Sequence, residues 1–542
     1  MDFALTATRQ RARSIRSITA LAVVSAVLVF PAASKGQAAR TKPAVPWLVG
    51  ENPAEEWTDK LPSAETTFTF HQEQVLGTSM DLAVATADRK TAQACERAVL
   101  DEIERLAGIL STYEPASEIS RLSGSGGYVK VSRELTEVLA AAQAWQQRSA
   151  GVFNIQVSAM AMLWREAERT GRPPAEQQLA AIARQIEKPA FELDVNGSRA
   201  RRVARQAVTV DALAKGYIIE KAVVAGRKAC PNAAGILLNI GGDLYAWGSA
   251  SLSSETPWVV GVANPRHRQD NAAPLVRVRL RNQGIATSGP YARGYRVAER
   301  HYSHIIDPRS GQPVEAIISA TAVASDAMTA DVLATCLNVL PPTEGLRLLA
   351  SVQGAEGLIV AADGKEYRSP GWAALEASAA PTSRPATLPA ADPVRKELII
   401  DLQLLRPARG RYMRPYVAIW IEDSAGEAVA TVAVWGHKRE YQKTLTTWWK
   451  IARQNPRLVE SISRATRPAG AYSLIWLLTD DQGKPVPPGT YSVCIEVNRE
   501  RGGHVTMRGR IDCRDRRASA TIKGNAEVAD VTLTYGWGAD EK

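Results

Sequence analysis

Asp331 and Thr335, two side chains that carry oxygen ligands, lie four residues apart in the stretch ISATAVASDAMTADVLAT. On an α-helix, residues with this spacing project from the same face. A carboxylate and a hydroxyl on one helix face can bind a hard cation such as Mg²⁺. The alternative is a surface aspartate next to a threonine that bonds to its own helix backbone, and on spacing alone this alternative is the commoner one.

The elements around this pair are readable from the sequence. The segment ISATAVA predicts a strand, and the following helix is expected to begin near Ser325 or Asp326, either of which can cap it. Upstream, HYSHIIDPRSG at 301–311 predicts a strand through Ile305 and Ile306 that enters a turn at Asp307. The sequence therefore predicts a strand, a turn, a second strand and a helix that presents the Asp/Thr pair.

Two further segments contain groups that could bind a ligand. In VLGTSM (75–80), Gly77 permits close backbone approach and Thr78 offers a hydroxyl, although a strand bend is the commoner explanation. In STYEPASEISRL (111–122), Tyr113 could cover an aromatic ring, and Glu118 and Arg121 could fix a polar ligand. An ordinary loop at the end of a helix is the commoner explanation there.

Two glycine-containing segments follow later in the chain. In TVDALAKGY (209–217), the charge of Lys215 near a helix start could meet a phosphate. In LNIGGDLYAWG (238–248), Gly241 and Gly242 let backbone N–H groups approach a ligand, although a hairpin turn is the commoner explanation. Each of these segments is weak support for a site when taken alone.

Length and composition suggest a multidomain exported protein. The 542 residues are enough for two or three domains. Residues 1–39 combine several arginines, a short apolar run at 18–30 and small residues, which together predict a secretory signal peptide. The apolar run is short for a membrane span, and an uncleaved anchor is the alternative. Export would allow Cys494 and Cys513 to pair, but the sequence does not show whether they do.

The rest of the chain divides into two folded regions. Residues 40–62 are expected to be a linker, and 63–374 alternate strands with helices near 89–110, 132–148, 174–187 and Lys215, which predicts an α+β domain. Residues 375–393 are rich in Ala, Pro, Ser and Thr, as expected of a second linker. Residues 394–538 contain strand-length apolar runs separated by turns, which predicts an all-β sandwich.

Several function classes lack support. The sequence contains no GxGxxG motif after a first strand, no P-loop and no GxSxG motif, which argues against a Rossmann enzyme, a P-loop phosphotransferase and an α/β hydrolase. The net charge is +10, but no basic block is interleaved with stacking aromatics, so no nucleic-acid partner is predicted.

Taken in order, seven motifs resemble the ApbE family of FAD:protein FMN transferases. They are VLGT, STYEPASEISRL, DALAKGY, LNIGGD, IATSG, HIIDPRSG and TADVLAT, and the resemblance covers residues 66–372. Residues 394–538 resemble a domain of unknown function that is often fused to this family, with a looser match.

The resemblance implies a T-fold-like α+β enzyme that binds FAD and Mg²⁺, followed by the all-β sandwich-like domain. Such an enzyme transfers the FMN moiety of FAD to a Thr or Ser hydroxyl of an acceptor flavoprotein and releases AMP. The expected acceptor is a flavoprotein subunit of a membrane or periplasmic redox complex, and the expected location is the periplasm. The implied metal ligands are the side chains of Asp331 and Thr335 and the backbone carbonyl of Ala212. The implied proton acceptor is His304 or Asp331.

The resemblance also implies a set of FAD contacts. The implied FAD-binding residues are Leu76, Tyr113, Val152, Phe153, Asn154, Thr209, Lys215, Gly241, Gly242 and Ile306. Four positions depart from the family pattern, because Asn154, Thr209 and Pro290 stand where Asp is common and Glu220 replaces another Asp. Neutral hydrogen-bonding residues can still bind adenine or ribose hydroxyls.

Two alternatives remain open at this point. One is a Mg²⁺-dependent FAD diphosphatase that passes FMN to water. The other is a non-catalytic flavin-binding or interaction protein in which these substitutions have removed turnover.

Overall fold

The computed structural model describes residues 67–537, apart from residues 268, 270, 290–293, 378–395, 407–411, 437–438, 456–458, 460–462, 465, 501 and 515–516. The predicted signal peptide, the predicted linker at 40–62, most of the predicted linker at 375–393 and Pro290 lie outside the described residues. None of the described helices is long and apolar enough to cross a membrane.

An eight-stranded antiparallel sheet forms the centre of the first domain. Its order is β1-β2-β6-β7-β10-β13-β14-β15. The strands are β1 (Thr67–Val75), β2 (Thr78–Ala85), β6 (Gly235–Ile240), β7 (Asp243–Gly248), β10 (Gln283–Ser288), β13 (Ile317–Ala324), β14 (Glu356–Ala361) and β15 (Glu366–Arg368). Every residue of β6 is buried, because both faces of the sheet are covered at this strand.

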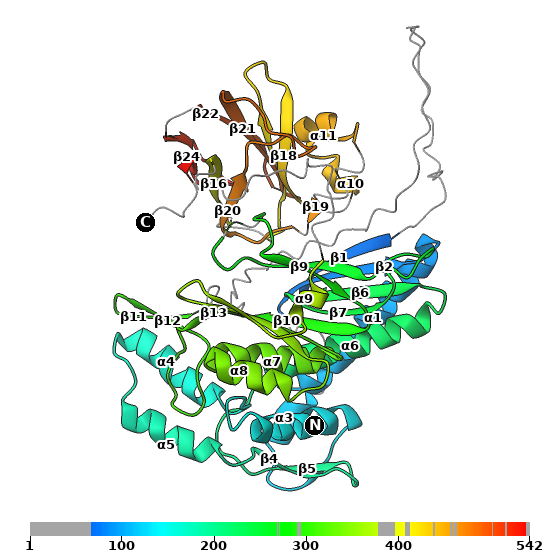
Figure 1. The fold of residues 1–542 in the computed structure, drawn as a ribbon, viewed down its shortest axis with the longest axis vertical. Coiled ribbons are helices and arrows are strands. Elements are labelled where there is room, and N and C mark those ends of the chain that lie inside the picture. Colours follow the sequence, from blue (N-terminus) through cyan, green and yellow to red (C-terminus); the bar gives the residue numbers. More distant parts are fainter. Residues whose placement is uncertain are drawn as a thin grey trace, which may run out of the picture.

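Helices cover one face of the sheet, and a strand pair covers the other (Figure 1). The helices on that first side are α1 (Arg89–Leu110), α3 (Arg133–Arg148), α6 (Asp211–Ala229), α7 (Ala327–Val339) and α8 (Pro342–Ala350). On the opposite face lie β8 (Trp258–Val262), β9 (Val276–Leu280) and α9 (Trp372–Leu375), where Trp258 and Trp372 are fully buried.

This domain has further elements outside the central sheet. They are α2 (Glu118–Ser123), α4 (Ser158–Thr170), α5 (Glu176–Ile186), the three-stranded sheet β3 (Val129–Lys130), β5 (Arg199–Arg202) and β4 (Phe191–Asp194), and the pair β11 (Gly294–Val297) and β12 (Arg300–Ser303). Figure 1 shows α5, β4 and β5 at the end of the molecule farthest from the C-terminal domain.

The second domain is a two-sheet sandwich. One sheet contains β20 (Gly470–Trp476), β16 (Lys396–Leu404), β24 (Val531–Trp537) and β23 (Ala518–Ile522). The other contains β19 (Ser463–Arg464), β18 (Ala428–Trp435), β17 (Tyr416–Glu422), β21 (Thr490–Asn498) and β22 (His504–Asp512). Apolar side chains from both sheets form one core between them. Two short helices, α10 (Arg439–Gln442) and α11 (Thr446–Ala452), were not predicted; α11 packs Trp448 against Trp420 on the outer face of the second sheet.

Side chains connect the two domains. Glu73, near the end of β1, accepts a hydrogen bond from Thr466 and forms an ion pair with Arg414. Asn271, between β8 and β9, donates to the backbone oxygen of Ile475 at 2.7 Å and accepts from its N–H at 2.8 Å. The sandwich therefore contacts the strand that leads into the β1–β2 turn.

The main secondary-structure predictions are confirmed, with local corrections. Asp326 caps α7 by accepting from the backbone N–H of Thr329, as predicted for this helix start. Ile305 and Ile306 do not form a strand, and Ile306 makes only an isolated bridge to Pro313. Their apolar character reflects burial rather than strand pairing. The helix α2 occupies part of STYEPASEISRL, where an ordinary loop was the commoner expectation.

All five cysteines are free and buried. Cys494 packs beside Trp448 on the outer face of its sheet, whereas Cys513 lies in the core between the sheets. Cys494 and Cys513 are therefore not paired in the structure, which answers a question that the sequence left open.

Candidate functional site

Turns that are far apart in the sequence meet at one end of the central sheet. Met80 pairs with Ile240, so the β1–β2 turn at Leu76–Gly77 and the β6–β7 turn at Gly241–Gly242 lie at the same end. Ile285 pairs with Leu244, which brings the end of β10 to the same place. The strand register therefore gathers the VLGT, LNIGGD and IATSG motifs.

The Gly241–Gly242 turn needs glycine. Its φ values are +62° and +99°, and a two-residue hairpin turn with two positive φ values strongly favours small residues. A Cβ on Gly241 would also lie 2.7 Å from the Thr78 methyl group, so the neighbouring hairpin packs directly on this backbone. Leu76 adopts φ +48°, an uncommon conformation for leucine.

Three polar side chains, one on each of three neighbouring strands, fix this turn from one side. Asn239 accepts from the N–H of Gly242 at 2.9 Å and donates to Asp81 at 3.1 Å. Asp81 in turn bonds to the imidazole Nδ1 of His71. The sequence interpretation missed Asn239 and Asp81, and the asparagine inside LNIGGD was the only available signal for either.

Asp243, the first residue of β7, anchors the cation of Lys215. Its carboxylate is buried, and its Oδ2 lies 2.5 Å from the Lys215 Nζ. Burial raises the pKa of Asp243, and the ammonium of Lys215 opposes this effect. Lys215 was predicted as an FAD contact; the structure places it at the Gly241–Gly242 turn through an acidic partner that the sequence interpretation missed.

Asp331 occupies the interior of the site. Its side chain is buried, and its Oδ2 has no hydrogen-bond partner among the described residues. Burial raises the pKa of Asp331 well above its usual value, and the nearby carboxylate of Asp243 raises it further. The cation of Lys215 and the backbone of Gly216 oppose this effect, which places Asp331 against the first turns of α6.

The close contact between α6 and α7 depends on Gly216. A Cβ at this position would lie 2.3 Å from the backbone oxygen of Ala327, at the start of α7. Glycine therefore lets the helix that carries Asp331 pack directly on the helix that carries Lys215.

The predicted metal ligands fit an oxygen-seeking cation. Thr335 lies one helical turn after Asp331 on α7 and is half-buried, while Ala212 lies in the first turn of α6. A carboxylate, a hydroxyl and a backbone carbonyl suit Mg²⁺, and a cation would give the Asp331 oxygen a partner. Within the described ranges, no group of three or more His, Cys, Asp or Glu side chains could hold a metal. This donor set depends on only one carboxylate.

Tyr113 and Thr209 both bond to Asp211 at the start of α6. The Tyr113 hydroxyl donates to Asp211 at 2.5 Å, and its side chain is 78% exposed. Thr209 accepts from the N–H of Asp211 at 3.3 Å. An exposed aromatic ring therefore stands beside the helix turn that contains Ala212.

The predicted FAD segment at 152–154 is buried. Val152 and Phe153 belong to the main core. Asn154 donates to the backbone oxygen of Ile186 at 2.8 Å and accepts from the N–H of Gln156 at 2.9 Å. These side chains hold the loop in place, and their contact with FAD stays a prediction.

The HIIDPRSG segment forms a tight turn. The N–H groups of Ser310 and Gly311 donate to the backbone oxygen of Asp307, whose carboxylate bonds to Arg309. Ile306 is buried beside Trp164, and His304 is half-buried just after β12. The roles predicted for His304 and Ile306 stay predictions.

Comparison with known proteins gives two family matches. Residues 76–359 match the ApbE family, and residues 397–530 match a family described as predicted periplasmic protein (DUF2271). A FAD:protein FMN transferase of Haemophilus influenzae is 27% identical over 292 residues, which covers 52% of this chain and 82% of that protein. One of Vibrio cholerae is 28% identical over 329 residues, covering 59% of this chain and 92% of that protein.

Solved structures agree with the fold. The ApbE protein of Thermotoga maritima superposes with a TM-score of 0.50 at 24% identity, covering 58% of this chain and all of that chain. The flavinyl transferase ApbE of Pseudomonas stutzeri, in its apo form, gives 0.50 at 22% identity, covering 59% of this chain and all of that chain. Both likenesses support the α+β fold of the first domain.

Proposed function

Since this chain belongs to the ApbE family, we propose that it transfers the FMN moiety of FAD to a Thr or Ser hydroxyl of an acceptor flavoprotein, releasing AMP. The observation that carries the proposal is the buried Asp331 carboxylate beside the Lys215–Asp243 ion pair, whose Oδ2 has no hydrogen-bond partner among the described residues. The curated relatives named FAD:protein FMN transferase supply the reaction class.

Mg²⁺ would be held by Asp331, Thr335 and the carbonyl of Ala212. When bound, the ion would neutralise negative charge that builds on the diphosphate oxygens as the bond between the phosphates breaks. The orphaned Asp331 oxygen supports this assignment, because an unpartnered buried carboxylate is costly unless a cation compensates it.

The remaining residues position FAD. Backbone N–H groups at the Gly241–Gly242 turn can approach a ligand because neither residue carries a side chain. Lys215, oriented by Asp243, supplies positive charge beside that turn. The exposed ring of Tyr113 can cover an aromatic ring of FAD.

The acceptor hydroxyl must lose a proton as it attacks the phosphorus. We assign this proton to His304, because Asp331 is already assigned to the metal and one carboxylate cannot freely serve in both roles. The match of the second domain to predicted periplasmic proteins supports a periplasmic acceptor, such as a flavoprotein subunit of a redox complex.

The test combines purified protein, FAD, Mg²⁺ and an exported flavoprotein subunit. Covalent flavin fluorescence on a denaturing gel, with one AMP released per flavin attached, is the expected result. Free FMN and AMP without labelled protein would instead identify a diphosphatase, and unchanged FAD would identify a binding protein. Asp331→Ala should abolish the labelling, whereas exposed Asp101→Ala on α1 should retain it.

A further inference from the structure

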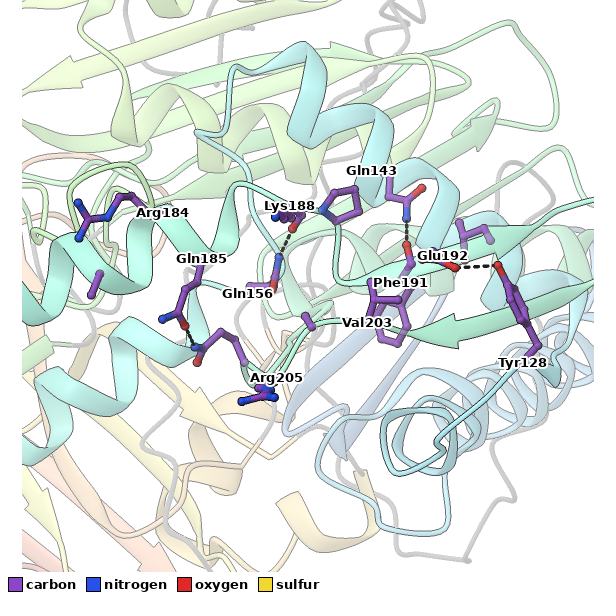
Figure 2. A pocket seen from close by; sticks show the side chains of 15 residues that line it. Tyr128, Gln143, Gln156, Arg184, Gln185, Lys188, Phe191, Glu192, Val203 and Arg205 are labelled. Atoms are coloured by element: carbon purple, nitrogen blue, oxygen red, sulfur yellow. Dashed lines mark hydrogen bonds between the residues drawn. The ribbon is translucent and has the colours of Figure 1, made fainter.

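A groove of about 1200 Å³ lies away from the sheet end, between α5 and the strands β4 and β5 (Figure 2). Its lining comes from the end of α5, from the segment at 188–193 and from the segment at 203–206 that follows β5. None of the residues predicted to bind FAD or metal lines it.

The groove is rich in uncompensated positive charge. Arg184, Lys188 and Arg205 line it, and all three are exposed. Across the described chain, no hydrogen bond or ion pair engages their charged groups. Residues 184–206 contain six Lys or Arg and three Asp or Glu. The acidic lining residue, Glu192, already accepts from Tyr128 at 2.9 Å and pairs with Arg201 at 2.5 Å. The groove therefore favours an anionic ligand.

A buried acceptor also lines the groove. Gln156 is fully buried, and its amide nitrogen donates to the backbone oxygen of Lys188 at 2.7 Å, as Figure 2 shows. Its Oε1 has no hydrogen-bond partner in the described structure. A buried polar atom without a partner is unfavourable, and an N–H donor that enters the groove would relieve this cost.

The groove adjoins the loop at 151–157, which carries the FAD contacts predicted at Val152–Asn154. Asn154 and Gln156 both donate to the backbone oxygen of Ile186. The N–H of Thr209, which precedes the first turn of α6, donates to the backbone oxygen of Ile155 at 2.7 Å. A partner held in the groove would be anchored on the same loop that carries Val152–Asn154.

We propose that this groove docks an acidic peptide segment of the acceptor flavoprotein. The proposal rests on the proposed transferase function and names how its protein substrate is recognised. Carboxylates of the segment meet Arg184, Lys188 and Arg205, and its peptide N–H groups supply donors for the Gln156 oxygen. Docking here concentrates the acceptor hydroxyl near the flavin site and therefore lowers the KM for the acceptor.

A nucleotide fits the groove less well than a peptide does. Base stacking needs an accessible aromatic face, but Arg199 and Arg201 lie over the Tyr128 ring at 5.6 and 5.1 Å from its centroid. Phe191, the other aromatic residue in the lining, is only 2% exposed. The charge and the unpartnered acceptor therefore point to a protein segment.

The test uses the full chain and two matched triple variants. Arg184→Glu/Lys188→Glu/Arg205→Glu reverses the groove charge. Arg97→Glu/Lys228→Glu/Arg347→Glu makes the same change in net charge at exposed positions on α1, α6 and α8. The probe is a fluorescein-labelled ten-residue oligoglutamate peptide, followed by fluorescence anisotropy at low salt. The groove variant should bind it at least tenfold more weakly, and the control variant should change less than threefold.

The second measurement uses the acceptor subunit. Its KM for flavin transfer should rise at least tenfold in the groove variant, while the Kd for FAD changes less than twofold. The proposal would be overturned if peptide binding weakened equally in both variants. It would also be overturned if the groove variant lost binding to phosphatidylglycerol vesicles but kept its binding of the peptide. The peptide assay needs no turnover, so an absence of flavin transfer would refute the proposed function separately.

Discussion

The substitution Asp331→Asn tests the metal assignment without relying on turnover. It keeps the shape of the side chain but removes the negative charge that the structure buries without a hydrogen-bond partner at Oδ2. If a cation normally compensates this charge, the metal-free wild-type protein is strained and the metal-free variant is not. We therefore expect Asp331→Asn to stabilise the protein in EDTA at pH 8.

The expected size follows from the cost of an unpaired buried group. Leaving such a group unsatisfied costs about 1–3 kcal/mol, and more when it is charged. For a domain of this size, each 1 kcal/mol shifts the melting temperature by about 2–4 °C, so the variant should melt about 2–12 °C higher in EDTA. Mg²⁺ at 100 times its Kd should stabilise the wild type by about 2.7 kcal/mol and leave the variant unchanged.

The assay is thermal unfolding followed by circular dichroism, with and without Mg²⁺, for the wild type, Asp331→Asn and Asp101→Asn. Asp101 is exposed on α1, so its substitution should shift stability by less than about 0.5 kcal/mol. Adding Mg²⁺ should remove most or all of the stability difference, because the ion stabilises the wild type and leaves Asp331→Asn unchanged. A variant that melts below the wild type in EDTA and still gains stability from Mg²⁺ would show that Asp331 does not bind the ion.

Five further predictions concern the metal site and other parts of the chain. In an FMN-transfer assay across a Mg²⁺ titration, Thr335→Ala should raise the Mg²⁺ requirement less than Asp331→Ala, since water can replace a neutral ligand. His304→Ala should slow transfer by about 10²–10⁴-fold at every Mg²⁺ concentration, and a parent rate would exclude it as the base. Burial raises the pKa of Glu220, and the charge of Asp326 raises it further. The stability that protonated Glu220 contributes is therefore lost as the pH rises above 4.5, the ordinary pKa of the group. Between pH 5 and 8, the urea midpoint of Glu220→Gln should rise relative to that of the wild type. A chain that ends at residue 380 retains α9 and should fold and turn over FAD. If this truncated protein folds well but is inactive, the C-terminal sandwich is needed for catalysis. Mass spectrometry of the exported protein should find a mature N-terminus between residues 33 and 39, and cytoplasmic protein beginning at Met1 would contradict the signal peptide.

The elements with local signals were predictable from the sequence. The helix predicted at 89–110 matches α1, because apolar residues recur at helical spacing and Asp88 caps its start. Ser132 likewise caps α3, and the glycine pair between two apolar runs forms the predicted hairpin turn. In each case, the information that fixes the element lies within a few residues of it.

The missing site residues depend on strand register instead. Asp243 meets Lys215 only because α6 packs against the start of β7, and nothing local in LNIGGD specifies that partner. Asp81 meets both Asn239 and His71 because these residues oppose one another across three strands. A shift of one residue in either pairing would turn these side chains to opposite faces of the sheet. Such contacts are properties of the folded register, and no single segment of sequence states them.

The departures from the family pattern become interpretable once the contacts are known. Asn154 uses both ends of its carboxamide on the backbone, and Thr209 accepts from the N–H of Asp211 at the start of α6. Both residues therefore stabilise the local backbone without a carboxylate, and neither leaves a buried charge unpaired. By contrast, position 331 is still an aspartate, and Asp243 is paired with Lys215. Because the two neutral replacements support their local backbone while Asp331 retains its carboxylate, we expect the substitutions to alter FAD contacts rather than to abolish catalysis.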